Sequence, residues 1–511
     1  MTKRAWFIGV ATAVLLAPTG VPVAADTIPD LTVLRERVRA SGGPIADSWR
    51  EIDETVSSDG TTTIEHDYRR GKDFRYTFDT GPFHTERGLS GGRRWHMNDN
   101  GQVIVDQPDP GQATREETTT TVAAIHTPVE GFVIATLNAQ GRGDKEYIDG
   151  ATFRVVRREQ VTTNGTIVST LDDVRPEGGR TFAHHVHIQN GYADTTSDLR
   201  VTAYAPDDVP ESDVAIPKAR RALVTFPPGV GAVDLPTNFG RSHIYVRVFI
   251  GGRGLDFVLD SGAGQITIDS DVARELGLKE YGKHSAVTAA RYTTARTIVP
   301  EMRVGSLVMR DVAIQEVPHG WNTAPGVKEV GLLGFDFLAE LGVTIDYEHR
   351  RVTVVPESAY VAPSDPSTIP VDVRVGGGQP RATVAVNGAL GERFIIDTGG
   401  AGTFLIFDYF ARRHPEALRD RGGGGGQRQR TLTGIGGAFE VEPYQIESLK
   451  LATVDFTDWV GYRVKGSSYS QNDDGIVGVE FLRLFTLGFD YGNNRMYLVP
   501  NTSGRAAMGL K

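Results

Sequence analysis

The feature that most constrains this chain is a short sequence that occurs twice. The segment Phe257–Gly264 reads FVLDSGAG, and the segment Phe394–Gly402 reads FIIDTGGAG. In each copy a run of large apolar residues ends at an aspartate, and a small hydroxyl residue and a glycine follow it. The apolar run predicts a buried strand. Asp-Ser/Thr-Gly predicts a tight turn that points the carboxylate out of the strand end. One copy alone indicates only a turn, so the evidence for a functional site is that the sequence occurs twice.

The surroundings of the two copies match as well. A glycine stands at the same distance before each aspartate, and farther along the chain equivalent residues stand at equal distances after Gly334 and Gly478. The matched pairs are Gly251 with Gly388, Leu332-Leu333-Gly334 with Ile476-Val477-Gly478, Asp346-Tyr347 with Asp490-Tyr491, and Pro356 with Pro500. Self-similarity of this kind predicts an internal duplication, and therefore two lobes built on one plan.

An apolar-apolar-Asp-Ser/Thr-Gly sequence followed by apolar-apolar-Gly, present twice, resembles the aspartic proteases of the pepsin/retropepsin type. The resemblance covers about residues 242–500. It implies a mainly β, bilobed fold of two pseudo-symmetric lobes, each with one catalytic aspartate, here Asp260 and Asp397. In that family the strands that end at Gly334 and Gly478 pass behind the aspartate loops and support them.

The residues next to the two aspartates receive supporting roles from the same resemblance. Ser261 and Thr398 are expected to join the two loops by hydrogen bonds. Gly262 and Gly399 allow the backbone to approach the carboxylates closely, because glycine has no Cβ.

Two neighbouring carboxylates provide a specific chemistry. Like charges at short distance do not both ionise easily, so the pair holds one proton near working pH, as is general for aspartic proteases. The ionised member takes a proton from water, and the protonated member binds the scissile carbonyl oxygen. This chemistry needs no metal and no cofactor.

The positions after the two Asp-Ser/Thr-Gly sequences set the expected acidity. Pepsin-like enzymes have Ser or Thr there, whereas this chain has Ala263 and Gly400. Hydrogen bonds to a charged carboxylate lower its pKa. Their loss therefore predicts a mildly acidic to neutral pH optimum, less acidic than that of pepsin.

A glycine-rich stretch of the second lobe resembles the retropepsin flap, a hairpin that closes over bound peptide. It comprises Gly434, Ile435, Gly436 and Gly437. Glycines suit a lid that bends and brings backbone N–H groups close to substrate. In the first lobe, position alone assigns Tyr292 to the flap. The alternatives are an ordinary glycine-rich hairpin tip and a surface tyrosine.

The start of the chain predicts export. Residues 1–25 combine a basic start, an apolar stretch and a small-residue cleavage site, which is typical of a signal peptide. The alternative is an uncleaved anchor. No later segment has the length of a membrane span, and the chain has no cysteine. A bacterial periplasm or exterior fits this composition best.

Composition and turn signals outline the domains. The 60 glycines and many short alternating segments favour β-structure, and the net charge of −10 argues against nucleic acid as a partner. We expect a separate β-rich N-terminal domain, with a helix over residues 31–40, ahead of the two lobes. The expected boundaries are 1–25 signal peptide, 27–208 N-terminal domain, 209–225 linker, 226–358 first lobe, 368–502 second lobe and 503–511 tail.

Three features of the N-terminal region invite other interpretations. Asp79-Thr80-Gly81 is a third Asp-Thr-Gly, but without a matching apolar-apolar-Gly it predicts a turn. His185 and His187 share one strand face, yet no carboxylate stands at ligand spacing, so we predict an exposed strand and no metal site. The segment Gly88–Gly101 resembles the half-barrels of outer-membrane lipoprotein carriers.

Together these features predict an exported, monomeric aspartic endopeptidase that hydrolyses polypeptides with water activated between Asp260 and Asp397. Two alternatives stay open. One is a catalytically silent peptide-binding or scaffold protein, and the other is a carrier of apolar ligands through the N-terminal domain.

Overall fold

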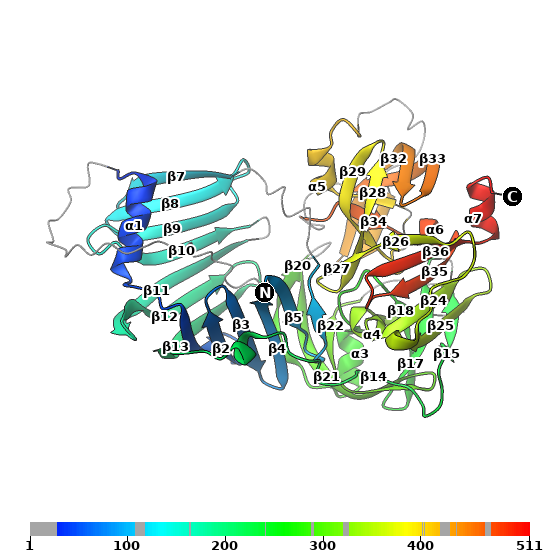
Figure 1. Cartoon of the computed structure of the whole chain (residues 1–511), viewed down its shortest axis with the longest axis horizontal. Helices are drawn as coiled ribbons and strands as arrows, with labels where there is room; N and C mark the ends of the chain where they lie inside the picture. Colours follow the sequence, from blue (N-terminus) through cyan, green and yellow to red (C-terminus); the bar gives the residue numbers. More distant parts are fainter. Residues whose placement is uncertain are drawn as a thin grey trace.

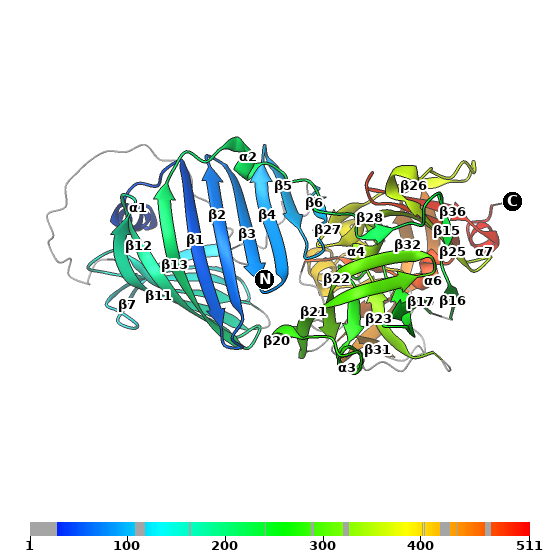
Figure 2. The same cartoon turned by 90° about the horizontal axis from the view of Figure 1, so that it is seen from below.

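A computed structural model describes residues 28–107, 118–162, 165–240, 242–287, 291–319, 327–400, 402, 404–418, 430–435, 437–464 and 472–510. The protein is mainly β, as predicted, with one large N-terminal sheet beside a two-lobed body (Figures 1 and 2). The expected signal peptide lies outside the described residues. Within them, no helix is long and apolar enough to cross a membrane.

The N-terminal domain is one antiparallel sheet of 13 strands in the order β6-β5-β4-β3-β2-β1-β13-β12-β11-β10-β9-β8-β7. Consecutive strands pair with each other throughout, except that β6 and β7 lie at opposite edges, and β1 pairs with β13. The strands are β1 (Ser48–Ser57), β2 (Thr62–Arg70), β3 (Asp73–Thr80), β4 (Phe83–Ser90), β5 (Arg93–Met97), β6 (Val103–Val105), β7 (Thr118–Ile125), β8 (Gly131–Asn138), β9 (Gly143–Asp149), β10 (Val155–Val161), β11 (Thr166–Glu177), β12 (Arg180–Asn190) and β13 (Thr195–Pro206).

Helix α1 (Leu31–Ser41) confirms the predicted N-terminal helix. Asp30 caps it by accepting a hydrogen bond from the Thr32 amide at 2.8 Å. The helix lies across strands β7 to β10 (Figure 1). Its fully buried Leu34 packs against Phe132 and Ile148, so the apolar stripe of the helix covers the apolar end of the sheet.

The stretch 209–225, expected as a linker, is packed against both parts that it joins. Helix α2 (Glu211–Val214) contacts strands β2, β3 and β4, and Val214 is fully buried. At the other end, Leu223 belongs to the core of the lobes, and β14 (Val224–Thr225) pairs with a strand of the first lobe. Burial of apolar side chains at both ends makes this segment a structural element.

The two lobes have matching strand orders once the additional pairings β21–β22 in the first lobe and β28–β32 in the second are included. The first lobe runs β14-β22-β19-β23-β18-β17-β21-β20, with β16 paired to β17. The second runs β27-β28-β29-β34-β30-β33-β32-β31. The first-lobe strands are β16 (Thr237–Phe239), β17 (Ile244–Ile250), β18 (Arg253–Leu259), β19 (Thr267–Asp269), β20 (Tyr281–Val287), β21 (Arg291–Val304), β22 (Leu307–Val317) and β23 (Glu329–Leu333). The second-lobe strands are β27 (Arg374–Gly376), β28 (Gln379–Val386), β29 (Ala389–Ile396), β30 (Phe404–Ile406), β31 (Arg430–Gly434), β32 (Gly437–Leu451), β33 (Val454–Val464) and β34 (Gly475–Val477).

A six-stranded sheet joins the lobes in the order β15-β25-β24-β35-β36-β26. Each lobe contributes three strands to this sheet. The strands β24 and β35 pair at the centre, and the two halves of the sheet have the same strand order outward from that pair. Its strands are β15 (Val233–Asp234), β24 (Leu341–Asp346), β25 (Arg351–Pro356), β26 (Ile369–Asp372), β35 (Phe485–Asp490) and β36 (Arg495–Pro500). Short helices complete the lobes: α3 (Ser270–Glu275), α4 (Phe335–Leu338), the 3-10 helix Glu357–Ala359, α5 (Asp408–Arg413), α6 (Val479–Leu482) and α7 (Thr502–Ala507), the last in the expected tail.

Candidate active site

Two equivalent strand pairs place Asp260 and Asp397. Strand β18 runs parallel to β23, and β29 runs parallel to β34. The Asp260 amide donates to the Leu333 carbonyl at 3.0 Å, and the Asp397 amide donates to the Val477 carbonyl at 3.1 Å. Each aspartate therefore follows a buried strand, and the apolar strand that ends at Gly334 or Gly478 supports it from behind.

The hydroxyls after the aspartates link the two loops by four reciprocal hydrogen bonds. Ser261 Oγ donates to the Ile396 carbonyl at 2.7 Å and accepts from the Thr398 amide at 3.0 Å. Thr398 Oγ1 donates to the Leu259 carbonyl at 2.8 Å and accepts from the Ser261 amide at 3.0 Å. Both side chains are 1% exposed, so each hydroxyl uses donor and acceptor where water cannot replace a lost partner.

Glycine is required beside each carboxylate by close packing across the lobes. A Cβ on Gly262 would lie 2.5 Å from Cγ of Asp397, and a Cβ on Gly399 would lie 2.4 Å from Cγ of Asp260. Distances this short are not possible for a real side chain. Each loop therefore lies directly against the carboxyl group of the other lobe.

The two carboxyl groups lie close enough for each to influence the protonation of the other. Oδ1 of Asp260 accepts from the amides of Gly262 at 2.8 Å and Ala263 at 3.0 Å, and Oδ1 of Asp397 accepts from Gly399 at 2.9 Å. Burial, together with the neighbouring negative charge of Asp397, raises the pKa of Asp260 well above its usual range. Burial also raises the pKa of Asp397. The pair is arranged to hold a shared proton.

Tyr491, which is buried, and Tyr347, which is half-buried, lie near the pair, and no sequence pattern assigned them a role. The pKa of Tyr347 is raised by burial and then by the charge of Asp397, and that of Tyr491 by burial and then by the charge of Asp260. Each tyrosine thus lies near the aspartate of the opposite lobe. The repeated Asp-Tyr pairs were the sequence signal that could have identified them.

His243 also lies near the carboxyl pair, and no sequence pattern indicated it. Its positive charge is one of the influences that lower the pKa of Asp397. Its Nδ1 lies 3.6 Å from Oε2 of Glu329, whose side chain is 1% exposed. The histidine follows the short strand β16 and precedes β17, so only the folding of that hairpin brings it toward the second-lobe aspartate.

The two hairpins at the flap positions have different surroundings. In the second lobe, Gly434 pairs with Gly437 at the tip of β31–β32, and Ile435 packs against Tyr245, Val258 and Leu332 of the first lobe. Gly436 lies outside the described residues. In the first lobe, the equivalent hairpin is β20–β21.

Tyr292 lies near the start of β21, opposite Ala286. Burial and the adjacent Tyr192 raise the pKa of Tyr292 to about 12. The aromatic neighbour of Tyr292 that this shift identifies therefore belongs to the N-terminal domain.

The other sequence features lie away from the pair. Thr80 ends β3, and Gly81 has a positive φ of 57°, as expected for a turn. His185 lies on a strand as predicted. The prediction that no carboxylate stands near His185 is wrong. Asp172 and Asp198 on the adjacent strands lie 2.6 and 3.0 Å from its ring nitrogens. Sequence spacing does not reveal cross-strand neighbours.

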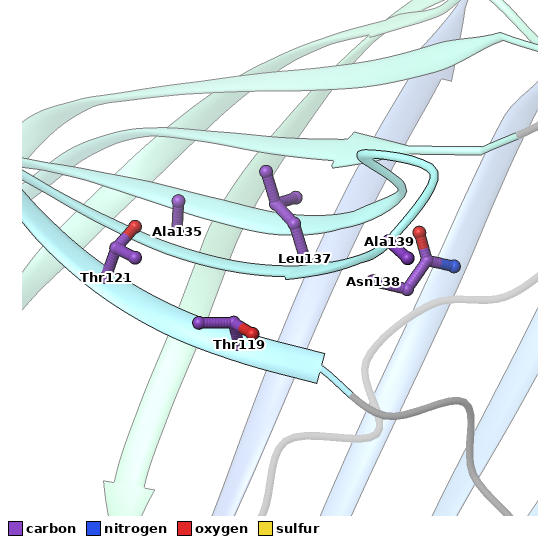
Figure 3. A pocket seen from close by; sticks show the side chains of 6 residues that line it. All are labelled: Thr119, Thr121, Ala135, Leu137, Asn138 and Ala139. Carbon is purple, nitrogen blue, oxygen red and sulfur yellow. The ribbon is translucent and has the colours of Figure 1, made fainter.

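No group of three or more His, Cys, Asp and Glu side chains in the described part of the chain is placed to hold a metal ion. Two hollows lie on the surface, one in the N-terminal domain and one beside the lobes. One, of about 320 Å³, lies between β7 and β8 and is lined by Thr119, Thr121, Ala135, Leu137, Asn138 and Ala139 (Figure 3). The other, of about 350 Å³, includes His243 and Tyr347 in its lining.

Comparison with known proteins agrees with the geometry of the first lobe. Residues 246–337 match the family model described as aspartyl protease. Among solved structures, an aspartic proteinase from Irpex lacteus is 14% identical, with 54% of this chain and 99% of that chain covered and a TM-score of 0.34. A LolA superfamily protein, NE2245 from Nitrosomonas europaea, is 12% identical, with 36% and 96% covered and a TM-score of 0.28. No curated protein sequence matches.

Proposed function

We propose that this protein is an aspartic endopeptidase that hydrolyses peptide bonds with water activated between Asp260 and Asp397. The observation that carries the proposal is the pair of adjacent carboxyl groups, each packed against the loop of the other lobe, with the two loops joined by the reciprocal Ser261 and Thr398 hydrogen bonds. The aspartyl protease match over residues 246–337 supports it independently.

The proposed reaction uses the pair in its singly protonated form. The ionised carboxylate accepts a proton from water, and the resulting hydroxide attacks the scissile carbonyl carbon. The protonated carboxyl donates a hydrogen bond to the carbonyl oxygen, where negative charge develops. Proton transfer to the leaving amine then breaks the C–N bond and releases both peptide products.

Each lobe contributes one carboxyl group, so a single chain completes the pair and we propose a monomer. The polypeptide substrate would lie beneath the hairpins β20–β21 and β31–β32. We further propose that the protein acts outside the cytoplasm, in the periplasm or medium of a bacterium. Residues 1–25 and the absence of cysteine from the sequence support this placement.

The test is cleavage of an unfolded protein mixture across pH by the chain without residues 1–25. Asp260→Asn, Asp397→Asn and the aspartic protease inhibitor pepstatin serve as controls. We expect cleavage by wild type only, with an optimum in the mildly acidic to neutral range, because both pKa values are raised. Absence of cleavage at every pH would favour the silent peptide-binding alternative. An optimum near pH 2 would contradict the assigned environment of the pair.

A further inference from the structure

A loop of the N-terminal domain enters the first lobe. It is the segment 98–102, which connects β5 to β6. The side chain of Asn100, which is 3% exposed, donates from Nδ2 to the Ala313 carbonyl at 3.0 Å. Its Oδ1 accepts from the Ala313 amide at 2.9 Å. Asn100 thus pairs with β22 as a neighbouring peptide would, which fixes the position of the loop.

The same loop holds Asp336 on both its side chain and its backbone. Asn98 Nδ2 donates to Oδ1 of Asp336 at 2.8 Å, and Gln102 Nε2 donates to the Asp336 carbonyl at 2.9 Å. The loop is itself rigid, because Oδ1 of Asn98 accepts from the amides of Asn100 at 3.1 Å and Gln102 at 3.0 Å. Two side-chain donors of the N-terminal domain, Asn98 and Gln102, therefore bind one residue of the first lobe, Asp336.

Asp336 in turn holds the segment that follows the Asp260 loop. Its Oδ2 accepts from the Ile266 amide at 3.1 Å, in a fully buried position. The adjacent Phe335 amide donates to the Ala263 carbonyl at 2.9 Å. A Cβ on Gly334 would lie 2.6 Å from that same oxygen, so the backbones are in direct contact. The start of α4 and residues 263–266 consequently move as one unit.

The second lobe has a different residue at this place. Glu480 occupies the position equivalent to Asp336, two residues after Gly478, and it is exposed to solvent. The backbone contact is retained, since the Val479 amide donates to the Gly400 carbonyl at 3.0 Å. The side-chain link through a buried carboxyl is thus a property of the first lobe.

We propose that Asn98 and Asp336 are positioning residues for the first catalytic loop, and that the N-terminal domain thereby holds Asp260 in its productive geometry. The inference rests on the proposed function and assigns that domain a role in it. Asp336 touches no reacting atom in this scheme. It acts through the Ile266 amide and the residues that follow the aspartate.

The chain offers a matched set of variants. Asn98→Asp removes the donor to Asp336 and keeps the Oδ1 that accepts from the Asn100 and Gln102 amides. Asp336→Asn leaves one acceptor oxygen for two donors, so one hydrogen bond is lost. The double variant Asn98→Asp with Asp336→Asn exchanges the partners, because the new amide donates to the new carboxylate. Glu480→Gln makes the equivalent change at the exposed site of the second lobe.

Two measurements on the full mature chain test the proposal. We expect each single variant to lower kcat about tenfold, which corresponds to a barrier change of about 1.4 kcal/mol, with little change in KM. Amide hydrogen exchange should rise in a peptide that spans residues 260–267 and stay unchanged in the peptide around Asp397. The exchanged pair should recover most of both properties, and Glu480→Gln should behave as wild type.

Several results would overturn the proposal. Folded single variants with unchanged exchange at residues 260–267 would show that the link does not position the loop, whatever their activity. Exchange that rises equally throughout the chain would show a general loss of stability. If wild type cleaves nothing, the proposed function fails, and the exchange experiment still decides whether the loop depends on Asn98.

Discussion

The two lobes are alike at the carboxyl pair and unlike around it. Both place an aspartate after a strand that runs parallel to an apolar partner, and both contribute one hydroxyl to the reciprocal hydrogen bonds. The first lobe is additionally packed against the N-terminal domain. The Ser285 amide donates to the Ala193 carbonyl at 2.9 Å, and Arg296 lies 3.2 Å from Asp99.

This difference indicates what each part of the site depends on. The carboxyl pair depends on a local pattern that both lobes carry. The hairpins depend on their external neighbours, because the outer strand of each, β20 or β31, lies at a sheet edge. The second-lobe tip rests on apolar residues of the first lobe through Ile435. The first-lobe hairpin is instead held from outside the two-lobed body, by Phe83 against Tyr281 among other contacts.

The strongest test of the similarity between the lobes is Asp260→Asn beside Asp397→Asn. Each removes one member of the pair, so we expect each to lower kcat/KM by at least about a thousandfold, by analogy with the loss of other catalytic residues. Peptidase assays of both variants at several pH values provide the comparison. Substantial activity in either variant would mean that the two lobes do not share the chemistry equally.

Gly262→Ala and Gly399→Ala test whether the lobes pack equally against each other. Either Cβ would overlap the carboxyl group of the opposite lobe, at 2.5 and 2.4 Å from Cγ. Displacement of a carboxyl by about 1 Å is expected to cost about a hundredfold in kcat. The two variants should be equally impaired. Kinetics and thermal unfolding measured together separate misplacement from loss of the fold.

Phe83→Ala examines the hairpin of the first lobe. Phe83 is 2% exposed, its ring centroid lies 5.5 Å from that of Tyr281, and Arg296 lies 4.2 Å above it. Loss of the ring should cost about 3 kcal/mol in the free energy of unfolding. Hydrogen exchange should rise along β20 and stay unchanged along β31. The control is Ile435→Ala, which should have the opposite pattern.

The smallest expected effect concerns pH and again separates the lobes. Burial, with a contribution from Asp99, raises the pKa of Asp336 from 3.8 to about 7, against the hydrogen bonds from the Ile266 amide and Asn98. The folded chain keeps this proton up to about pH 7, whereas the unfolded chain releases it near pH 4. The associated stability is present below pH 4 and is lost as pH rises to 7.

Asp336→Asn removes this titration. Its melting temperature should therefore depend less on pH than that of wild type between pH 4 and 7. Glu480→Gln should retain the wild-type dependence, because Glu480 is exposed. Thermal unfolding at three or four pH values decides between these outcomes. Parallel curves for wild type and Asp336→Asn would contradict the assigned burial of the Asp336 carboxyl.

The sequence by itself predicted those features that short segments determine. Apolar runs and turn residues predicted a mainly β chain, and this prediction is confirmed. The spacing of Leu31, Leu34 and Val38 predicted the N-terminal helix, which the structure has as α1. The repeat itself located both aspartates before any geometry was known. In all of these the determining residues are neighbours along the chain, so burial pattern and turn chemistry are readable directly.

Only the tertiary structure decided which distant groups meet. Asn98 reaches Asp336 across 238 residues of sequence, and His243 comes near Asp397 although His243 itself stands in no recognisable pattern. The same holds for Asp172 and Asp198 beside His185. Contacts of this kind depend on strand register and on how one sheet docks on another. Those are set by the summed packing of many side chains, and no local spacing records the result.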